Sequence, residues 1–486
     1  MLERERELAV LGGALAAATT GRGSVVVVAG EAGIGKTTLI KAFRRTVPGR
    51  VRVLDGACDD LLAPPTLGPL REAVRRQPGP LADALAGGDP EQVFGGVVDE
   101  LSGPAPTLLV VEDLHWADDA TIDVLRYLVR RLDTLPAVLV LSLRDDTTGH
   151  SDRLTRLLAA IAAVGGPRLD LRPLSADAVA ALAVPAGRAA DDLVQLTGGN
   201  PFYVTEVLAG PPGSVPTTVA ATVLARLQGL GPDARRGLEQ LSVLCGTIEL
   251  SLAADLLGDG LASLVEAEQS GMIEIGAGRL TFRHELARRA IEANVPALRR
   301  QVCHRAVVGV LATRVPVDVP RLVHHAVLAG DAETVITAAP DAARAAARAG
   351  SSRQARRLFE AVLRYGDRLA EADHARLLDE YGWELYNAHR FEDAVVAGRR
   401  AVTLYEGLDQ PVARGEALLR LSRHVYMTGD TAAAVRAVEQ AIALLGPLLP
   451  APELAHAYTQ QGALQALVGE SDQAVATLTR SRGLAE

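Results

Sequence analysis

The stretch "GEAGIGKTT" at residues 30–38 decides the fold of the N-terminal part of the chain. It directly follows "SVVVVAG" (24–30), a β-branched run typical of a buried parallel strand. It matches the pattern G-x-x-x-x-G-K-[ST], whose glycines let backbone N–H groups curl around phosphate oxygens at the start of a helix. The sequence therefore predicts a phosphate-binding loop between a strand and a helix.

The residues of this loop have expected roles toward a bound nucleotide, ATP or ADP. We expect Lys36 to reach the β and γ phosphates as a point charge and the Thr37 hydroxyl to ligate Mg²⁺. Lysine occurs only twice in the chain, at Lys36 and Lys41, which argues against a chance match in a glycine-rich sequence. The expected phosphate-binding residues are Gly30, Gly33, Gly35, Lys36, Thr37 and Thr38.

Strand-like and helix-like segments alternate over about the first 175 residues of the chain. Such alternation indicates an α/β domain, with a parallel sheet covered by helices on both faces. The further strand candidates are "VRVLDGA" (51–57), "TLLVVED" (107–113), "AVLVLSL" (137–143) and "RLDLRPL" (168–174).

Two adjacent acids, Glu112 and Asp113, end the apolar run "TLLVVED". In a phosphate-binding fold of this kind, a second strand ends in a carboxylate that faces the metal. We expect Glu112 to orient metal-bound water, and Asp113 to polarise an attacking water or to bind the metal. The candidate metal ligands are therefore Thr37, Glu112 and Asp113. The alternative is that both acids are solvated charges at a strand end.

Arg144 follows the strand candidate 137–143 in "LSLRDD". A cation at the end of that strand is expected near the γ phosphate, where it can distinguish ATP from ADP. The alternative is an ordinary surface arginine. Arg144, together with Glu112 and Asp113, forms the set of candidate catalytic residues.

The C-terminal part of the chain is helical and repetitive. Four alanines, Ala355, Ala394, Ala434 and Ala474, recur at intervals of 39, 40 and 40 residues, each at a turn-to-helix junction. A fixed period near forty with two helices per unit is typical of a helical solenoid. The alternative is coincidence in an alanine-rich chain.

The organisation along the chain is predicted as a multidomain α/β plus α architecture. Helices followed by two short alternating runs around "GAGR" suggest a winged-helix shape ahead of the repeats. The expected parts are a P-loop NTPase domain (1–174), a helical lid (175–212), a winged-helix-like domain (213–296) and TPR-like helical repeats (297–486).

Composition excludes some functions. The formal net charge is −9, whereas protein chains that bind nucleic acid are usually basic. A nucleic-acid-binding module within these residues is therefore not expected. The three cysteines lie far apart, without CxxC spacing, as expected in a reducing compartment. The N-terminus is too charged for a signal peptide, and no apolar run approaches the length of a membrane span. We expect a cytoplasmic protein that needs no membrane.

Five motifs, taken in order, resemble those of a known class. The segments "GEAGIGKTT", "VVEDLHWADD", "LSLRDD", "TGGNPFYVTEVL" and "FRHELARRAI" are similar to the STAND class of signalling ATPases, which is related to AAA+ proteins. More closely, they resemble the large ATP-binding LuxR-family (MalT-like) regulators of actinobacteria. The resemblance covers about residues 1–310 by motif, and the helical repeats continue it.

The resemblance implies an ATP-dependent switch with slow or gated hydrolysis. In that class, nucleotide is held between the P-loop, helical and winged-helix domains, and the repeats sense an inducer or protein partner. Nucleotide exchange then permits self-association. The resemblance also implies that Arg4 lies by the nucleotide base, that Pro201 contacts adenine, and that the winged-helix His284 senses whether a diphosphate is bound. Each of the three has an ordinary structural alternative: a surface charge, a helix start and a packed histidine.

The sequence departs from the pattern of these regulators at several points. Glu112 stands where aspartate is common, so the metal geometry can shift and turnover can be slow. Glu285 replaces an aspartate, and Glu3 replaces a leading glycine. The regulators also end in a helix-turn-helix domain, which nothing past residue 482 can supply, so no DNA binding is expected from this chain alone. Two alternatives stay open: an ATP-binding scaffold that recruits a protein partner, and a constitutively cycling AAA+ ATPase.

Overall fold

The computed structural model describes residues 2–75, 77–87, 89–144, 151–186, 190–209, 219–448 and 452–485. The chain divides into two compact units, Met1–Asp331 and Ala332–Glu486. The second unit therefore begins after the expected start of the repeats at residue 297. The two units are described in turn.

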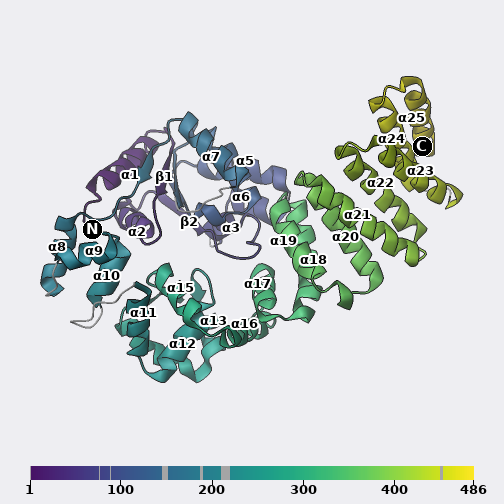
Figure 1. Ribbon diagram of the computed structural model, residues 1–486. Helices are drawn as coiled ribbons and strands as arrows, with labels where there is room; N and C mark the ends of the chain where they lie inside the picture. Colours follow the sequence, from purple (N-terminus) through teal and green to yellow (C-terminus); the bar gives the residue numbers. More distant parts are fainter. Residues whose placement is uncertain are drawn as a thin grey trace. The chain divides into compact units, whose positions relative to one another are not determined.

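A five-stranded parallel sheet forms the centre of the first unit (Figure 1). Its strand order is β2-β3-β4-β1-β5, so the strand that precedes the phosphate-binding loop lies between β4 and β5. All five strand candidates are confirmed, and the last is shorter than expected. The strands are β1 (Ser24–Ala29), β2 (Arg52–Ala57), β3 (Thr107–Glu112), β4 (Ala137–Leu143) and β5 (Arg168–Asp170).

Helices cover both faces of this sheet because successive strand residues point to opposite sides. Val26 and Val28 pack in one core with helices α1 (Glu5–Ala18) and α2 (Lys36–Thr46). Val25 and Val27 pack in a second core with the helices of the other face. Those helices are α3 (Gly68–Val74), α4 (Pro80–Gly87), α5 (Pro90–Leu101), α6 (Asp119–Val129) and α7 (Asp152–Ala163). The predicted α/β architecture is confirmed.

Helices and a small antiparallel sheet follow in the same unit. The sheet order is β6-β8-β7, and β7 and β8 form a hairpin around Ala277 and Gly278, both at positive φ. Two positive φ values suit a tight two-residue hairpin turn. The predicted late hairpin is present, whereas the expected boundary at residue 212 lies outside the described residues.

The helices of this part are α8 (Ala176–Ala183), α9 (Ala190–Thr197), α10 (Pro201–Ala209), α11 (Val219–Gln228), α12 (Pro232–Ser242), α13 (Leu250–Leu257), α14 (Leu264–Gln269), α15 (Glu285–Asn294), α16 (Ala297–Leu311) and α17 (Val319–Ala329). Its strands are β6 (Ile248–Glu249), β7 (Ile273–Gly276) and β8 (Arg279–Phe282). Short 3-10 turns are η1 (Leu114–Trp116), η2 (Leu132–Thr134), η3 (Val184–Ala186) and η4 (Gly258–Ser263).

Three histidines join α16 and α17 to the loop after β2. The Nδ1 atoms of His304 and His325 lie 2.8 Å apart, and the Leu62 N–H donates to Nδ1 of His324 at 3.0 Å. Burial lowers the pKa of His304 and of His324 to about 4, and Arg300 beside His304 acts in the same direction. These imidazoles are therefore neutral near pH 7.

This cluster makes the stability of the first unit dependent on pH. A folded-state pKa below the unfolded value means that the unfolded state binds more protons, so stability falls as pH decreases from about 6.5 toward 4. We expect a loss of about 2 kcal/mol for one such group between pH 7 and pH 5. Thermal melting at both pH values measures it. His304→Gln should flatten the dependence, and the exposed-site control His456→Gln should leave it unchanged.

The second unit consists of paired helices in four repeats (Figure 1). Ala355, Ala394, Ala434 and Ala474 are each at most 3% exposed, as expected for small residues at which helices meet. The pairs are α18 (Ala332–Arg348) with α19 (Ser352–Leu363), α20 (Glu371–Asn387) with α21 (Phe391–Gly407), α22 (Pro411–Met427) with α23 (Thr431–Leu445), and α24 (Pro452–Leu467) with α25 (Ser471–Ala485). Short turns are η5 (Gly366–Arg368) and η6 (Gly446–Leu448). The predicted TPR-like repeats are present.

Within the described ranges, no helix has both the length and the apolar character that crossing a membrane requires.

Candidate functional site

The phosphate-binding loop joins β1 to α2, as the motif predicts. Gly30, Gly33 and Gly35 have φ values of 146°, 80° and 102°, a region that glycine adopts without the clash of a β-carbon. A β-carbon at Gly33 would also lie only 2.8 Å from Cβ of Phe202. The backbone of the loop therefore requires glycine, and α2 begins directly at Lys36.

Lys36 and Thr37, the residues expected to bind the nucleotide and its metal, make hydrogen bonds within the protein. The Lys36 ammonium donates to the carbonyl oxygens of Gly30 at 2.6 Å and Glu31 at 2.8 Å, so it lies against the loop. The Thr37 hydroxyl donates to Oε2 of Glu112 at 2.6 Å. Thr38 is exposed in the first turn of α2.

Thr37 and Glu112 fit a magnesium site. They come from α2 and from the end of β3, and they present a hydroxyl and a carboxylate oxygen side by side. Mg²⁺ takes oxygen ligands and is usually bound by few protein groups, with water and phosphate oxygens completing its shell. The pair therefore has the chemistry for Mg²⁺ bound together with a nucleotide.

Several charges surround the Glu112 carboxylate. Burial raises its pKa, the hydrogen bond from Thr37 lowers it, and the neighbouring acids Asp113 and Asp55 raise it again. Lys41 is near enough to act in the opposite direction. A bound cation would relieve this crowding of acids. Both lysines of the chain thus lie by the site, although the sequence analysis gave Lys41 no role.

Asp113 lies at the centre of a group of charges from several segments. Its backbone N–H donates to Oγ of Ser142 on β4 at 2.9 Å, which holds the residue at a φ of 55°. Burial raises the pKa of Asp113, while the nearby cations Arg144 and Lys36 lower it. The structure therefore places Arg144 close enough to Asp113 to act on its charge, while the expected contact of Arg144 with the γ phosphate stays a prediction.

Two residues of α15 also act on Asp113. Glu285 raises its pKa and Arg289 lowers it. The guanidinium carbons of Arg144 and Arg289 lie 4.7 Å and 5.2 Å from the ring centroid of Trp116, which packs partly buried against the core. The ring of Trp116 thus supports both cations by cation–π contact. No local sequence pattern indicates that Arg289 belongs to the site, because it lies far along the chain from the phosphate-binding motif at residues 30–38.

The start of α10 contacts the phosphate-binding loop directly. The Asn200 amide donates to the Ala32 carbonyl oxygen at 3.0 Å, and the Phe202 N–H donates to that of Gly33 at 3.2 Å. Pro201, the first residue of α10, lies between these two contacts. Its proposed contact with adenine stays a prediction.

His284 caps the start of α15 next to the same segment. Its ring centroid lies 4.7 Å from that of Phe202, and its Nε2 lies 4.0 Å from Oε1 of Glu206. Burial lowers the pKa of His284 to about 4, and Arg283, Arg226 and Lys41 act in the same direction. The imidazole is therefore neutral near pH 7. Two residues later, Cδ1 of Leu286 lies 3.0 Å from where a β-carbon of Gly33 would be.

Arg4 is buried at the junction between β5 and α8. Its guanidinium donates to the carbonyl oxygens of Arg172 at 2.6 Å and Glu3 at 3.0 Å. Glu3 has a φ of 55°, a backbone conformation that glycine adopts more readily than glutamate. The Glu3 carboxylate accepts hydrogen bonds from the N–H and hydroxyl of Ser175, at the start of α8. The role of Arg4 at a nucleotide base stays a prediction.

A comparison with protein families identifies a known domain in the N-terminal part of the chain. The family model of the AAA ATPase domain matches residues 1–141. An uncharacterized protein of Rhizobium meliloti is 26% identical over 464 aligned residues, covering 78% of this chain and 44% of that protein. The chain therefore spans less than half the length of this curated relative.

Solved structures with detectable similarity are distant in sequence. A STAND protein with a tetratricopeptide repeat sensor from Pyrococcus horikoshii is 15% identical, with a TM-score of 0.46. The match covers 100% of this chain and 77% of the Pyrococcus horikoshii chain. A Walker-type ATPase of Pyrococcus abyssi is 14% identical, with a TM-score of 0.32. The match covers 60% of this chain and 96% of the Pyrococcus abyssi chain. Residues 1–141, which hold the phosphate-binding loop and the strand that ends at Glu112, have the sequence signature of an AAA ATPase domain.

Proposed function

We propose that this chain is an ATP-binding switch of the STAND type, which holds a nucleotide and hydrolyses it slowly or only when gated. One observation carries the proposal: two segments far along the chain, the start of α10 and the first turn of α15, meet at the phosphate-binding loop. Asn200 and Phe202 bond to its carbonyl oxygens, and Leu286 packs against Gly33. A nucleotide on this loop would be enclosed by α10 and α15 as well as by the sheet.

Ion pairs hold the helical part against the loop that follows β2. Arg289 of α15 pairs with Asp60 at 2.7 Å, and Arg321 of α17 pairs with Asp59 at 3.5 Å. Such contacts are weak individually and can therefore break and reform. They are suited to a closed arrangement that opens when a signal arrives.

The surroundings of Asp113 suggest how hydrolysis would be gated. The carboxylate lies near Lys36, Arg144 and Arg289, and the last of these belongs to α15. A movement of α15 would remove both Glu285 and Arg289 from the surroundings of Asp113, and would thereby change how readily Asp113 polarises an attacking water. In this proposal Mg²⁺ neutralises charge on the phosphates when bound, while Thr37 and Glu112 position it.

The helical repeats suggest a second candidate function, a scaffold that binds ATP structurally and recruits a protein partner. Extraction of bound nucleotide separates the candidates. A switch should be purified with ADP or ATP retained, show little phosphate release with Mg²⁺, and self-associate when ADP is exchanged for ATP. A scaffold would retain nucleotide without changing its association state, and an empty site with rapid turnover would instead indicate a cycling ATPase.

The Arg289→Ala variant tests the closed arrangement. Removing this cation breaks the contact with Asp60 and weakens the approach of α15 to Asp113. We expect nucleotide release to accelerate about fivefold, since a partly exposed ion pair contributes about 1 kcal/mol. Release of a fluorescent ADP analogue measures the rate. The control Arg236→Ala removes an exposed pair with Asp233 and should not alter it; an equal acceleration there would refute the assignment.

A further inference from the structure

Asn200 connects the start of α10 to the phosphate-binding loop through both ends of its side-chain amide. Its Nδ2 group donates to the Ala32 carbonyl oxygen at 3.0 Å, and its Oδ1 atom accepts a hydrogen bond from the Phe202 N–H at 3.1 Å. Asn200 is only 5% exposed. A buried amide whose donor and acceptor both have partners keeps one orientation, so Asn200 can act as a fixed connector between the two segments.

The glycine of the loop that faces Asn200 is Gly33. A β-carbon at Gly33 would lie 2.8 Å from Cβ of Phe202 and 3.1 Å from Oδ1 of Asn200. The Gly33 carbonyl oxygen also accepts a hydrogen bond from the Phe202 N–H at 3.2 Å. The start of α10 therefore binds two consecutive carbonyl groups of the loop, those of Ala32 and Gly33, at a place where only glycine allows so close an approach.

The turn before Asn200 is anchored to the segment that follows β5. The Leu174 N–H donates to the Gly199 carbonyl oxygen at 2.8 Å, and a β-carbon at Gly199 would lie only 2.3 Å from the Leu174 carbonyl oxygen. Strand β5 pairs with β1, which leads into the phosphate-binding loop. Asn200 thus reaches Ala32 from a turn that is tied to the same sheet, which gives its amide a defined position relative to the loop.

The hydrogen bond to the Ala32 carbonyl also fixes the direction of the next N–H group. In a trans peptide unit the carbonyl and the N–H point in opposite directions. Because the Ala32 carbonyl points toward Asn200, the Gly33 N–H points away from it. In the described parts of the chain, no protein group accepts a hydrogen bond from this N–H. Backbone N–H groups of such a loop are the groups that bind phosphate oxygens.

We propose that Asn200 is a positioning residue for the phosphates: its amide holds the Ala32–Gly33 peptide unit in the orientation that directs the Gly33 N–H to a phosphate oxygen of the nucleotide. When the start of α10 moves away, this peptide unit is no longer held and the loop binds phosphate less tightly. The inference rests on the proposed nucleotide switch and deepens it by naming a contact through which the helical part controls nucleotide affinity. Because such coupling is reciprocal, bound nucleotide favours the closed position of α10.

Helix capping is the ordinary alternative role of Asn200. Its Oδ1 atom accepts from the second residue of α10, as the side chain of an N-terminal cap residue does. Aspartate caps helices as well as asparagine does, but an ionised aspartate cannot donate to the Ala32 carbonyl. Asn200→Asp therefore keeps the cap and removes the proposed contact, whereas Asn200→Ala removes both.

The test compares the binding of ADP and of pyrophosphate to the full chain with Mg²⁺ at pH 8.5, by displacement of a fluorescent ADP analogue. Pyrophosphate presents phosphates without a base, and the high pH favours the ionised form of the introduced aspartate. We expect Asn200→Asp and Asn200→Ala each to weaken both ligands by about tenfold or more, because a hydrogen bond to a charged phosphate is lost. The two ligands should weaken by similar factors.

Four other results would overturn the inference. Affinity like that of the parent in Asn200→Asp, with weakening only in Asn200→Ala, would assign Asn200 to helix capping. Weakening only in Asn200→Asp would reflect repulsion between its carboxylate and the phosphates. Weaker ADP binding with unchanged pyrophosphate binding would place the contribution of Asn200 at the base. A parent chain that binds ADP but not millimolar pyrophosphate would show that the loop does not hold phosphates by itself.

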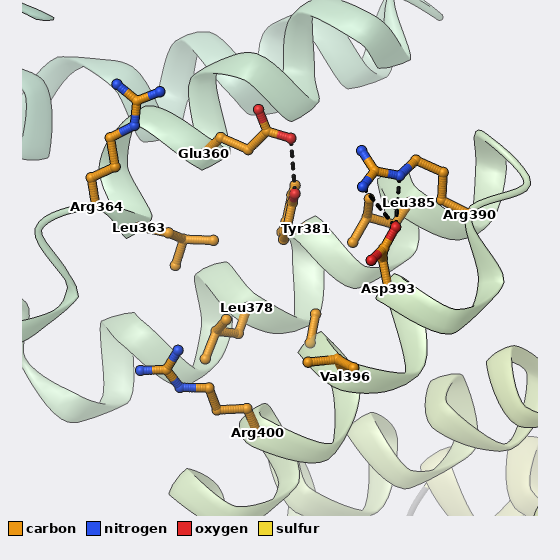
Figure 2. Close-up of a pocket in the computed structure, with 11 residues that line it drawn as sticks. Glu360, Leu363, Arg364, Leu378, Tyr381, Leu385, Arg390, Asp393, Val396 and Arg400 are labelled. Atoms are coloured by element: carbon orange, nitrogen blue, oxygen red, sulfur yellow. Dashed lines mark hydrogen bonds and ion pairs between the residues drawn. The ribbon is translucent and has the colours of Figure 1, made fainter.

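Two control variants separate the proposed contact from general effects on the fold. Thr205→Ala changes an exposed residue of α10 whose hydroxyl donates only to the Phe202 carbonyl oxygen of the same helix. Tyr381→Phe removes a hydrogen bond of 2.9 Å to Glu360 in the other compact unit (Figure 2). Both should bind ADP and pyrophosphate as the parent does. Circular dichroism spectra should be the same for the parent and all four variants.

The parent chain separates failure of this inference from failure of the proposed function. A parent that binds neither ADP nor pyrophosphate would contradict the proposed function, and the inference with it. A parent that binds both ligands, with Asn200 variants that bind them equally well, would overturn only the role of Asn200. The retained nucleotide that extraction measures would then still support the switch.

Discussion

The Lys36→Ala variant is expected to be purified without bound nucleotide. In the parent protein, the Lys36 ammonium lies against the carbonyl oxygens of Gly30 and Glu31 at the start of α2, where it would meet the terminal phosphates. Without it, the negative phosphates face only backbone N–H groups and the helix dipole. We expect nucleotide affinity to fall about 100-fold or more, since a charge-assisted contact of this kind contributes about 3 kcal/mol. Acid extraction and chromatography measure the bound nucleotide.

Two controls separate lost binding from lost folding. Lys36 is buried, so Lys36→Met, which keeps the length of the side chain, should give the same loss of nucleotide with an unchanged circular dichroism spectrum. Arg45→Ala removes an exposed cation on the same helix and should retain nucleotide. If Lys36→Ala still holds one nucleotide per chain, the binding site lies elsewhere.

The fold of the first unit was predictable because its signals are local. Each strand is a short apolar run whose residues alternate between two buried faces, and each run is bounded by turn residues. The β5 candidate extended too far because Leu171 is buried like a strand residue, although pairing to β1 ends at Asp170. The repeat period was visible because close helix packing admits only small residues at Ala355 and its equivalents.

The candidate site was predictable only where its residues belong to local motifs. The Thr37–Glu112 contact joins the phosphate-binding loop after β1 to the end of β3, which β4 separates from β1 in the sheet. Asn200 and Arg289 reach the same place from positions far along the chain, through packing that no local pattern encodes. The proximity of Lys41 to Glu112 could not be predicted from the scarcity of lysine in the chain. The position of a residue in a helix does not show which charges its side chain approaches.

The boundary expected at residue 297 differs from the division of the chain into compact units. Helices α16 and α17 have the lengths of repeat helices, but both belong to the first compact unit. Their histidines contact each other and the loop after β2, which includes Leu62. Helical periodicity reveals that a helix is amphipathic, whereas the identity of its partner depends on tertiary contacts.

The Glu112 variants have the second large expected effect, because they change the carboxylate that we propose as a ligand of Mg²⁺. Glu112→Gln removes the charge and keeps the size. We expect Mg²⁺-dependent ATP hydrolysis to fall about 100-fold, since a ligand that loses its charge would bind Mg²⁺ less tightly and leave the charge of the phosphates poorly neutralised. Phosphate release over a range of Mg²⁺ concentrations measures the effect. Asp55→Asn is the matched control: it removes a nearby acid that is paired with Arg44 at 2.8 Å, and should have a small effect.

Glu112→Asp tests why turnover should be slow in the parent protein. The glutamate carboxylate reaches the Thr37 hydroxyl at 2.6 Å, so a metal must displace or share this contact. Aspartate is shorter by one methylene and withdraws the carboxylate, which leaves room for Mg²⁺ with its water shell between the two side chains. We expect hydrolysis to rise about tenfold, an activation-energy change of about 1.4 kcal/mol. A lower rate in Glu112→Asp would show instead that the longer carboxylate is already optimally placed, and that slow turnover, if observed, arises from the enclosure of the loop by α10 and α15.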